Sequence, residues 1–551
     1  MLEKKEKIHL EIQTSRKSPV GVLRSSYYDN GKIKHRQYGR IKGKTVEELK
    51  LLQLAFKGKL ISRDDPNAFQ ILDSKEYGAS STILAMIKDL GLDKVIDSKL
   101  SDWSKNIAAM IAGRIIYQGS KLSLVNQFEN TCLWQIAANI EDRPDVKENC
   151  YLPLDELLKR QNLIQKKLAK KHLTDGHLVL YDITSSYLEG EYKDSEIVKY
   201  GYNRDGKKGH EQIVIGLLCS KEGCPVAVEI FAGNAKDEST VIEKINQLKN
   251  HYQLNKIIFV GDRGMVTKSN IDKIKEDKDV KTISALTRFE IRDLLAREVI
   301  QPDLFDDNNI HEVIDDKNPS KRYCLCKNPL SANRDRESRN RLINLTTQEL
   351  SKIADYKQAT TVEILGSRIG KILQKRKMGK YINWHVKADT DNIKSRNHKV
   401  TWSLNQEKIA ESESLDGCYI ITTDVAKEDM ATAKVVANYK RLELVEQAFR
   451  NLKTTQLEVR PIYHKKDDRI KSHVFLCMLA YYVQWHMMQR LKPLFNEDST
   501  GANRRWTFAG VIESLRQITK NKTQANGVIF YQNTKLNKNQ KKILKYLEVA
   551  I

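Results

Sequence analysis

The chain has 551 residues, of which 40% are hydrophobic and 30% charged, and its formal net charge is +23. This length suits several domains, and the positive surplus favours a polyanionic partner. The charged N-terminal segment lacks the apolar core of a signal peptide, the apolar runs are too short to span a membrane, and the eight cysteines show no zinc-ligand spacing. We therefore expect an intracellular protein with reduced thiols.

The N-terminal part predicts a hairpin followed by helices. In residues 1–45, two β-prone runs, VLRSSYY and KIKHRQYG, flank Asn30 and Gly31, which form a typical hairpin turn. In residues 46–175, apolar residues recur with helical spacing in segments such as TVEELKLLQLAF and NIAAMIAGRIIY. The sequence thus predicts an N-terminal β-hairpin segment and a basic, mainly helical domain.

Residues 176–289 have the pattern of an α/β domain. Three strand-like runs, HLVLYDITSSYLEG, EQIVIGLLCS and CPVAVEIFAG, precede a helix at 237–252 and the run NKIIFVGDRG. A short helix at 269–277 and the run VKTISALT complete the order β-β-β-α-β-α-β. Meandering strands followed by helical crossovers predict a mixed sheet covered by helices. This is the order of a ribonuclease H-like core.

The remaining chain divides into three parts. Residues 290–425 are highly charged and contain the β-like runs KYINWHVKA, HKVTWSLN and GCYIITTD, which predicts a β-rich insertion that interrupts the core. Residues 426–492 return to helices, and we expect them to complete the core. Residues 493–551 predict a basic, helical C-terminal region, in which lysines and arginines beyond residue 500 far outnumber Glu513 and Glu548. That charge suits either a phosphate contact or a solvated surface.

The segment YKRLELVEQAFRNLK, residues 439–453, predicts an amphipathic helix with a carboxylate beside its buried face. At 100° of turn per residue, the apolar face carries Leu442, Val445, Phe449 and Leu452. The polar shoulder beside it carries Tyr439, Glu446, Arg450 and Lys453. Ordinary ion pairs between residues one turn apart would explain this pattern. So would a glutamate that reaches a site in the core while its basic neighbours reach a phosphate.

Two aspartates close strand-like runs of the predicted core. Asp182 follows LVLY and Asp262 follows IIFVG. Each could cap a turn, but both lie where a ribonuclease H-like fold places metal ligands, and Glu446 follows on a helix that could pack on the same sheet. Clustered carboxylates resist ionisation without a cation, and Mg²⁺ prefers such oxygen ligands. Two ions about 3.5–4 Å apart can activate the attacking oxygen and stabilise the leaving oxygen of an in-line displacement.

Several motifs together resemble one protein family. The segments YDITSSYLEG, GNAKDEST, VGDRGM, DGCYIITTD and YKRLELVEQAFRNLK are similar to bacterial insertion-sequence transposases of the DDE type. Among these, they resemble the cut-and-paste group with a β-rich insertion before the third carboxylate. The resemblance implies that Asp182, Asp262 and Glu446 form a catalytic, metal-binding triad. It also implies Mg²⁺ as the cofactor, two ions in number, with Mn²⁺ as a substitute.

That group has a signature around its glutamate, Y-x2-R-x3-E-x6-K. Tyr439, Glu446 and Lys453 match it, whereas Leu442 occupies the expected arginine position. On the helical wheel, Arg450 is the best-placed substitute for a phosphate contact. Tyr439, Arg450 and Lys453 are therefore candidate DNA-binding residues.

The resemblance also implies a reaction and its partners. Water attacks the phosphodiester at each element end, and the exposed 3′-hydroxyl then joins target DNA by transesterification. The helical domain would bind the terminal inverted repeats in double-stranded DNA, and a homodimer would hold two ends in a synaptic complex. We expect a cytoplasmic, nucleoid-associated protein with no membrane partner. Some relatives hold a flipped base with an aromatic residue of the insertion; Trp402 and Trp384 are candidates, although a buried core position is the simpler explanation.

Two other functions fit the same residues. One is a metal-dependent nuclease of the same fold that hydrolyses nucleic acid without joining it, since the acids alone do not distinguish water from a 3′-hydroxyl. The other is a catalytically inactive DNA-binding derivative, which Leu442 at the arginine position favours. A strand-transfer assay tests the first alternative, and metal-dependent cleavage tests the second.

Overall fold

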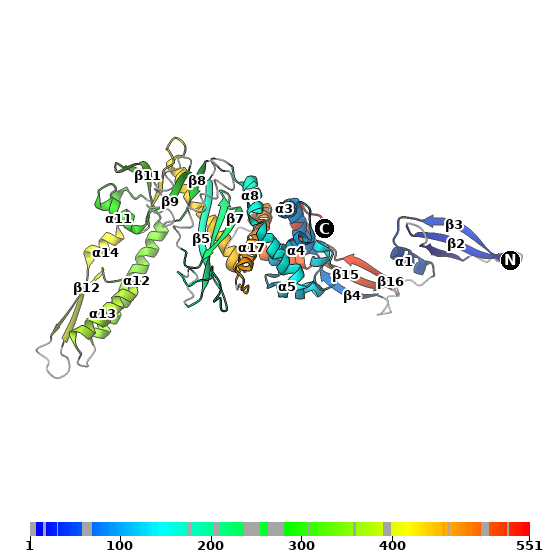
Figure 1. Ribbon diagram of the computed structural model, residues 1–551, viewed down its shortest axis with the longest axis horizontal. Helices are drawn as coiled ribbons and strands as arrows, with labels where there is room; N and C mark the ends of the chain where they lie inside the picture. The colour runs from blue at the N-terminus through cyan, green and yellow to red at the C-terminus, as the bar shows by residue number, and fades with distance from the viewer. Residues whose placement is uncertain are drawn as a thin grey trace.

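The structure of the protein is a computed structural model, shown in Figure 1. It describes residues 7–14, 18–29, 31–57, 69–174, 176, 178–202, 204, 209–235, 254, 256–262, 280–306, 309–355, 360–388, 398–455, 457–460, 462–497, 506–525 and 528–551. The helices expected at 237–252 and 269–277 lie outside the described residues.

A mixed sheet of eight strands lies at the centre of the molecule, in the order β10-β11-β14-β9-β8-β5-β6-β7. The strands are β5 (Leu178–Tyr187), β6 (Gln212–Ser220), β7 (Pro225–Ala232), β8 (Ile257–Val260), β9 (Val280–Ala285), β10 (His311–Asp315), β11 (Asn318–Lys327) and β14 (Cys418–Thr423). β8 is parallel to β5 and β9, and the other neighbouring pairs are antiparallel. The predicted mixed α/β architecture is therefore confirmed.

Helices cover this sheet, so its central strands are buried on both faces. Every residue of β6 is buried, so neither face of that strand can meet water. α17 (Asp467–Arg490) and α8 (Gln161–His172) pack on β7, and α16 (Leu442–Arg450) packs on β5. One continuous hydrophobic core joins these helices to the sheet. The long helix expected at 469–492 is confirmed as α17.

The helical region packs on the same core. Its further helices are α2 (Gly78–Asp89), α3 (Leu92–Ile96), α4 (Asp102–Tyr117), α5 (Lys121–Asn126), α6 (Leu133–Ala138) and α7 (Leu152–Lys159), with the short turns η1 (Gln127–Asn130) and η2 (Lys147–Tyr151). The C-terminal helices are α18 (Lys492–Asn496), α19 (Phe508–Arg516) and α20 (Lys538–Leu547). α4 and α7 contact α17, and α19 contacts α2. The helices from α2 onwards and the C-terminal helices thus pack together beside the sheet.

Three strands occur where we expected helices. β4 (Phe69–Glu76) lies within 46–175, and β15 (Thr519–Ala525) and β16 (Val528–Asn533) lie in the C-terminal region. They form a sheet in the order β16-β15-β4. The expectation of a helical C-terminal region therefore holds for α19 and α20 but missed β15 and β16. Local periodicity does not show these strands, because β4 is largely exposed and is stabilised by pairing with a segment from the other end of the chain.

The N-terminal hairpin is confirmed. β2 (Val20–Asp29) pairs with β3 (Lys32–Ile41), and β1 (Ile8–Gln13), which was not predicted, pairs with β2. α1 (Val46–Phe56) follows and begins with a capping box. In this box the Thr45 hydroxyl accepts from the backbone of Glu48, and the Glu48 carboxylate accepts from the backbone of Thr45.

Part of the expected insertion belongs to the central sheet. β10, β11 and β14 lie within 290–425 but extend the sheet beyond β9. Residues 329–413 project from it (Figure 1) and have a small core of their own. The elements of this projection are α12 (Pro329–Ala354), α13 (Val362–Arg376), β12 (Ile382–Ala388), β13 (His398–Leu404) and α14 (Gln406–Glu413). α11 (Arg288–Ala296) and η3 (Pro302–Leu304) precede it in the chain. The residues expected as an insertion therefore divide into strands that extend the central sheet and a projecting part, a division that depends on strand pairing and is not visible in the sequence.

Among the described residues, no helix is long and apolar enough to cross a membrane. All eight cysteines are buried thiols.

Candidate active site

Asp182 and Asp262 occupy equivalent positions on two neighbouring parallel strands. In the ladder between β5 and β8, Leu180 pairs with Val260. Asp182 lies two residues further along, within β5, which continues to Tyr187 and does not end at the aspartate as expected; Asp262 lies two residues beyond Val260, just past the end of β8. The preceding residues of both strands are largely buried and apolar, which holds the two strands in the core of the sheet. The strand pairing therefore brings the two aspartates to the same edge of the sheet.

Glu446 approaches this edge on α16. Glu446 itself is exposed. The predicted apolar face is buried, as the helical wheel indicated; it consists of Leu442, Val445, Phe449 and Leu452. Gly223, in the turn between β6 and β7, has a φ of +85°, and an added Cβ would lie 2.8 Å from Cβ of Leu444. The turn and β5 together determine where α16 lies.

The single helix expected over 439–453 is broken. α15 (Thr432–Lys440) ends before Arg441, α16 begins at Leu442, and the π-helical turn η4 (Asn451–Thr455) follows. Tyr439 and Lys453 therefore do not share one helix with Glu446. The wheel predicted the buried face but not these two side chains, because it assumes an unbroken helix. Arg441 donates to the carbonyl of Lys221, at 2.9 Å.

Asp182 lies in an unusual electrostatic environment. Burial raises the pKa of Asp182 to about 7, and the charges of Asp262 and Glu446 act in the same direction. The backbone N–H of Ile183, which donates to Oδ1 of Asp182 at 2.7 Å, and the nearby charge of Arg204 oppose this rise in pKa. The three acids thus act on one another, and a cation between them would relieve their repulsion.

Two further signature residues contact the strands that carry the aspartates. The hydroxyl of Tyr439 donates to Oδ1 of Asp262, at 3.2 Å. The ammonium of Lys453 donates to the hydroxyl of Thr184 and to the carbonyl of Ser185, both in β5. Arg450 is exposed at the end of α16. The structure thus gathers Tyr439 and Lys453 at the edge that bears the acids.

The donor set suits divalent ions, but not one ion held by all three acids. Carboxylate oxygens are the ligands that Mg²⁺ prefers. Within the described part of the chain, the ligand atoms of the three acids do not all lie within 4.8 Å of one another. The group that meets this distance is His172, Cys224 and His486. Asp182, Asp262 and Glu446 are therefore the residues that could hold divalent ions, without all three contacting one ion.

Trp402 is not brought together with the acids. Trp402 on β13 pairs directly with Trp384 on β12. Both are partly buried against the small core of the projection. Figure 1 places β12 at the outer part of the projection, well away from β5. Their packing agrees with the core explanation of both tryptophans.

Sequence reasoning missed Arg204, which lies beside the candidate site. Its Nη1 donates to the carbonyl of Ile183 at 3.0 Å, and its backbone N–H donates to Oγ of Ser185 at 2.9 Å. Both acceptors are in β5, next to Asp182. The only sequence signal was a cationic stretch, RDGKKGH, between two predicted strands.

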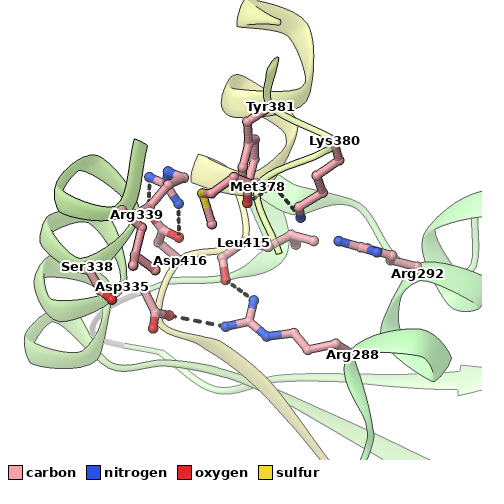
Figure 2. A pocket seen from close by; sticks show the side chains of 12 residues that line it. Arg288, Arg292, Asp335, Ser338, Arg339, Met378, Lys380, Tyr381, Leu415 and Asp416 are labelled. Carbon is pink, nitrogen blue, oxygen red and sulfur yellow. Dashed lines mark hydrogen bonds and ion pairs between the residues drawn. The ribbon is translucent and has the colours of Figure 1, made fainter. Parts of the chain in front are cut away.

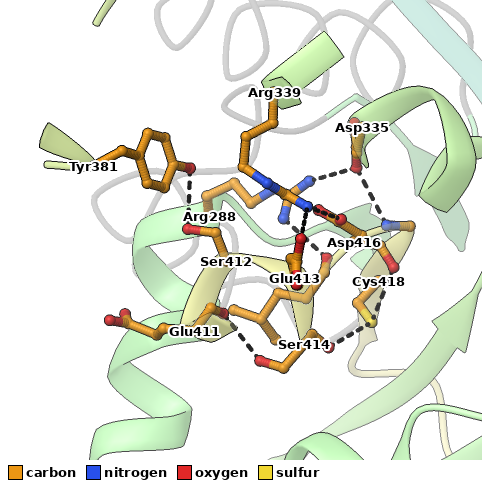
Figure 3. A network of polar contacts seen from close by, with 12 residues as sticks. Arg288, Asp335, Arg339, Tyr381, Glu411, Ser412, Glu413, Ser414, Asp416 and Cys418 are labelled. Atoms are coloured by element: carbon orange, nitrogen blue, oxygen red, sulfur yellow. Dashed lines mark hydrogen bonds and ion pairs between the residues drawn. The ribbon is translucent and has the colours of Figure 1, made fainter. Parts of the chain in front are cut away.

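The base of the projection contains a cluster of ion pairs that the sequence did not reveal. A cavity of about 310 Å³ lies there, with Arg288, Arg339, Asp335 and Asp416 in its wall (Figure 2). Arg339 donates to both carboxylate oxygens of Asp416, each at 2.7 Å, and Arg288 donates to Asp335 at 3.1 Å (Figure 3). Each of these two arginines is paired with a protein carboxylate. Because the pairs link α12 to α11 and to Asp416, just before β14, the cluster joins the projection to the sheet.

Comparison with known proteins identifies the family. A family model described as "Transposase DDE domain" matches residues 175–483, more than half of the chain. A solved structure, the Mos1 transposase paired-end complex with left transposon end, aligns with 43% of this chain and 67% of that chain. Its sequence identity is 13% and its TM-score is 0.14, which is too low to support an argument. No curated protein matches the chain. The chain therefore belongs to the family of transposases with a DDE domain.

Proposed function

We propose that this protein is an insertion-sequence transposase of bacterial type, in which Asp182, Asp262 and Glu446 hold divalent metal ions and act on DNA phosphodiesters. Membership of the family supports DNA transposition as the process. The observation that carries the residue assignment is the matched register of the two aspartates, together with the charge of Glu446 acting on the same carboxyl group.

The residues around the acids have supporting roles in this proposal. Mg²⁺, with Mn²⁺ as a substitute, would supply Lewis-acid stabilisation of the attacking and leaving oxygens. Tyr439 orients Asp262 through its hydrogen bond, and Lys453 ties the turn after Glu446 to β5. Arg450 provides a phosphate contact at the exposed end of α16. The net charge of +23 attracts the DNA over a longer range.

The larger parts of the chain have distinct roles in the same proposal. The helical region at 46–175 binds the terminal inverted repeats, and two copies of the chain hold two ends in a synaptic complex. The projecting part of the insertion reaches DNA outside the acid site. The basic residues of 493–551 contact the phosphate backbone.

The test of the residue assignment is Asp182→Asn. Inverted repeats flanking the gene would supply the DNA substrate. We expect the wild-type protein to cleave at the repeat ends with Mg²⁺ and not with a chelator, and the variant to lose cleavage while it retains DNA affinity. Asp316→Asn, at an exposed aspartate in the turn between β10 and β11, is the matched control. Cleavage by Asp182→Asn at the wild-type rate would refute the assignment.

Strand transfer distinguishes a transposase from a nuclease. DNA ends cut in advance at the repeats and carrying free 3′-hydroxyls are incubated with the protein, Mg²⁺ and a plasmid target. A transposase joins the ends to the plasmid, and a nuclease only degrades the DNA. Joined products that disappear with Asp262→Asn and with Glu446→Gln would assign both activities to one site.

A further inference from the structure

A second cavity, of about 560 Å³, lies where the helical region meets the chain that follows α16. Its wall combines the junction of α4 and α5 with residues 458–464 and with the second turn of α17. Tyr463 in its wall is 66% exposed, so the cavity is open to solvent. The candidate active site does not include these residues.

Lys121 places a buried ammonium group in this cavity. Only 6% of the residue is exposed. Its Nζ donates to Nδ1 of His473, at 2.6 Å. Burial, followed by the charge of Arg114, lowers the pKa of Lys121 to about 7, and burial holds the pKa of His473 well below its usual range. The amine is therefore only partly protonated near neutral pH, and its partner is a neutral imidazole and not a carboxylate, so a bound anion would favour the ammonium form.

Arg114 adds a second buried cation whose partners are also neutral. It is 6% exposed, and its Nη1 donates to the carbonyls of Gln118 at 3.0 Å, Leu457 at 3.4 Å and Glu458 at 3.5 Å. Gln118 and Glu458 have φ values of 54° and 41°, a left-handed conformation that is uncommon outside glycine. Arg114 thus holds two strained corners of the chain against the cavity, and such strain often lies at functional sites.

The charge in this cavity differs from that of the cavity in Figure 2. There, Arg288 and Arg339 each have a carboxylate partner. In the part of the chain that the structure describes, neither Arg114 nor Lys121 forms an ion pair with a carboxylate; Glu458 is the one acid in the cavity wall. Buried charges are costly unless they are paired. An external anion would supply the missing partner.

The cavity is also linked to the strand that carries Asp182. The guanidinium of Arg460 lies in the cavity wall and 5.1 Å over the ring of Tyr187, the last residue of β5. The hydroxyl of Tyr192 donates to the carbonyl of Ile462, at 3.1 Å. Residues 457–464 therefore connect the cavity to the end of the strand that positions Asp182.

We propose that this cavity binds one phosphate of the DNA backbone, with Lys121, Arg114 and Arg460 as its cationic contacts. The source of the phosphate rests on the proposed function, whereas the anion site itself rests on Lys121 and Arg114, which have no carboxylate partner among the described residues. A phosphate held here would fix the path of DNA that leaves the acid site. It would also pair the buried ammonium with an opposite charge.

The first experiment measures inorganic phosphate binding by thermal unfolding of the full-length protein, with chloride at equal ionic strength as the reference. We expect phosphate to raise the melting temperature of the wild-type protein. Lys121→Met should weaken the apparent phosphate affinity about tenfold or more, the effect of one lost charge-assisted hydrogen bond. Lys317→Met, at an exposed lysine between β10 and β11, should keep the wild-type response.

The same variant separates a binding role from a structural one. Without phosphate, Lys121→Met should melt at or above the wild-type temperature, because methionine fills a similar volume and removes an unpaired buried charge. A lower melting temperature without phosphate would show that Lys121 serves the fold, and would overturn the proposal. A wild-type protein that phosphate does not stabilise would also overturn it.

The second experiment identifies the source of the phosphate. Binding of a duplex oligonucleotide is measured at several salt concentrations. Each lost phosphate contact should lower the slope of log affinity against log salt by about 0.9, in Lys121→Met but not in Lys317→Met. If Lys121→Met lost its stabilisation by inorganic phosphate but kept the wild-type salt slope of DNA binding, DNA would be excluded as the ligand of this cavity. A failure of the proposed catalytic function appears separately, as absent cleavage by wild-type protein that still binds phosphate.

Discussion

The hydroxyl of Tyr439 donates a hydrogen bond of 3.2 Å to Oδ1 of Asp262, although the two residues are 177 positions apart. Tyr439 lies near the end of α15, and Asp262 lies just beyond β8. The bond connects the helix that leads to Glu446 with the strand neighbouring that of Asp182. The bond therefore links the position of Asp262 to that of the helical segment that carries Glu446.

Removing this hydroxyl should slow the chemistry without unfolding the protein. Tyr439→Phe loses one hydrogen bond to a carboxylate, and we expect the single-turnover cleavage rate to fall about tenfold. The melting temperature should change little, since both groups are partly or fully exposed. Tyr28→Phe, at a tyrosine that is 76% exposed in β2, is the control. Unchanged cleavage by Tyr439→Phe would show that the bond has no role in the site.

Asp182→Asn should stabilise the metal-free protein more at pH 8 than at pH 5. Burial raises the pKa of Asp182 from 3.8 to about 7, so between these values the folded state binds more protons than the unfolded state. The stability that this group contributes is complete below pH 3.8 and is lost progressively as the pH rises from there through 7. The amide carries no charge at either pH.

Urea unfolding with a chelator present measures this difference. We expect a gain of about 1–3 kcal/mol at pH 8, less than the full value of the pKa shift because the site is partly exposed. Adding Mn²⁺ should stabilise the wild-type protein at pH 8 and leave the variant unchanged. A variant that is less stable than the wild-type protein at pH 8 would contradict the electrostatic account of Asp182.

Lys453→Met should weaken the join between η4 and β5. The ammonium donates to Thr184 and to the carbonyl of Ser185, and methionine makes neither bond. We expect a loss of about 1–3 kcal/mol in the free energy of unfolding, together with slower cleavage, because the turn after Glu446 is released. Arg450→Gln, at the exposed end of α16, should instead weaken DNA binding with no loss of stability. Equal free energies of unfolding for the wild-type protein and Lys453→Met would show that Lys453 does not hold η4 against β5.

Arg339→Met should loosen the projecting part of the insertion. Arg339 and Asp416 form a buried pair through two hydrogen bonds of 2.7 Å (Figure 3), so the variant leaves a buried carboxylate without its cation. We expect a cost of about 3–5 kcal/mol, seen as faster hydrogen exchange in α12 and α14. The double variant Arg339→Met with Asp416→Leu should recover much of this loss. Exchange that is as fast in the double variant would contradict a specific ion-pair effect.

The positions of the acids could be predicted because their signals are local. Asp182 and Asp262 each follow a run of apolar residues, and the buried face around Glu446 repeats with helical spacing. The break at Arg441 could not be predicted, since helix propensity continues through it. The pairing of β4 with β15 was also invisible, because the two strands come from opposite ends of the chain and neither has a strongly apolar pattern.

The amino-acid sequence by itself determined the apolar strand runs, the acids that follow these runs and the apolar stripe of α16, since each depends on neighbours a few positions away. Only the tertiary structure decided which strands pair, how Tyr439 and Lys453 reach Asp262 and β5, and that Lys121 and Arg114 are buried without a carboxylate. The physical reason is that register, burial and charge compensation depend on side chains that approach one another only in the folded chain.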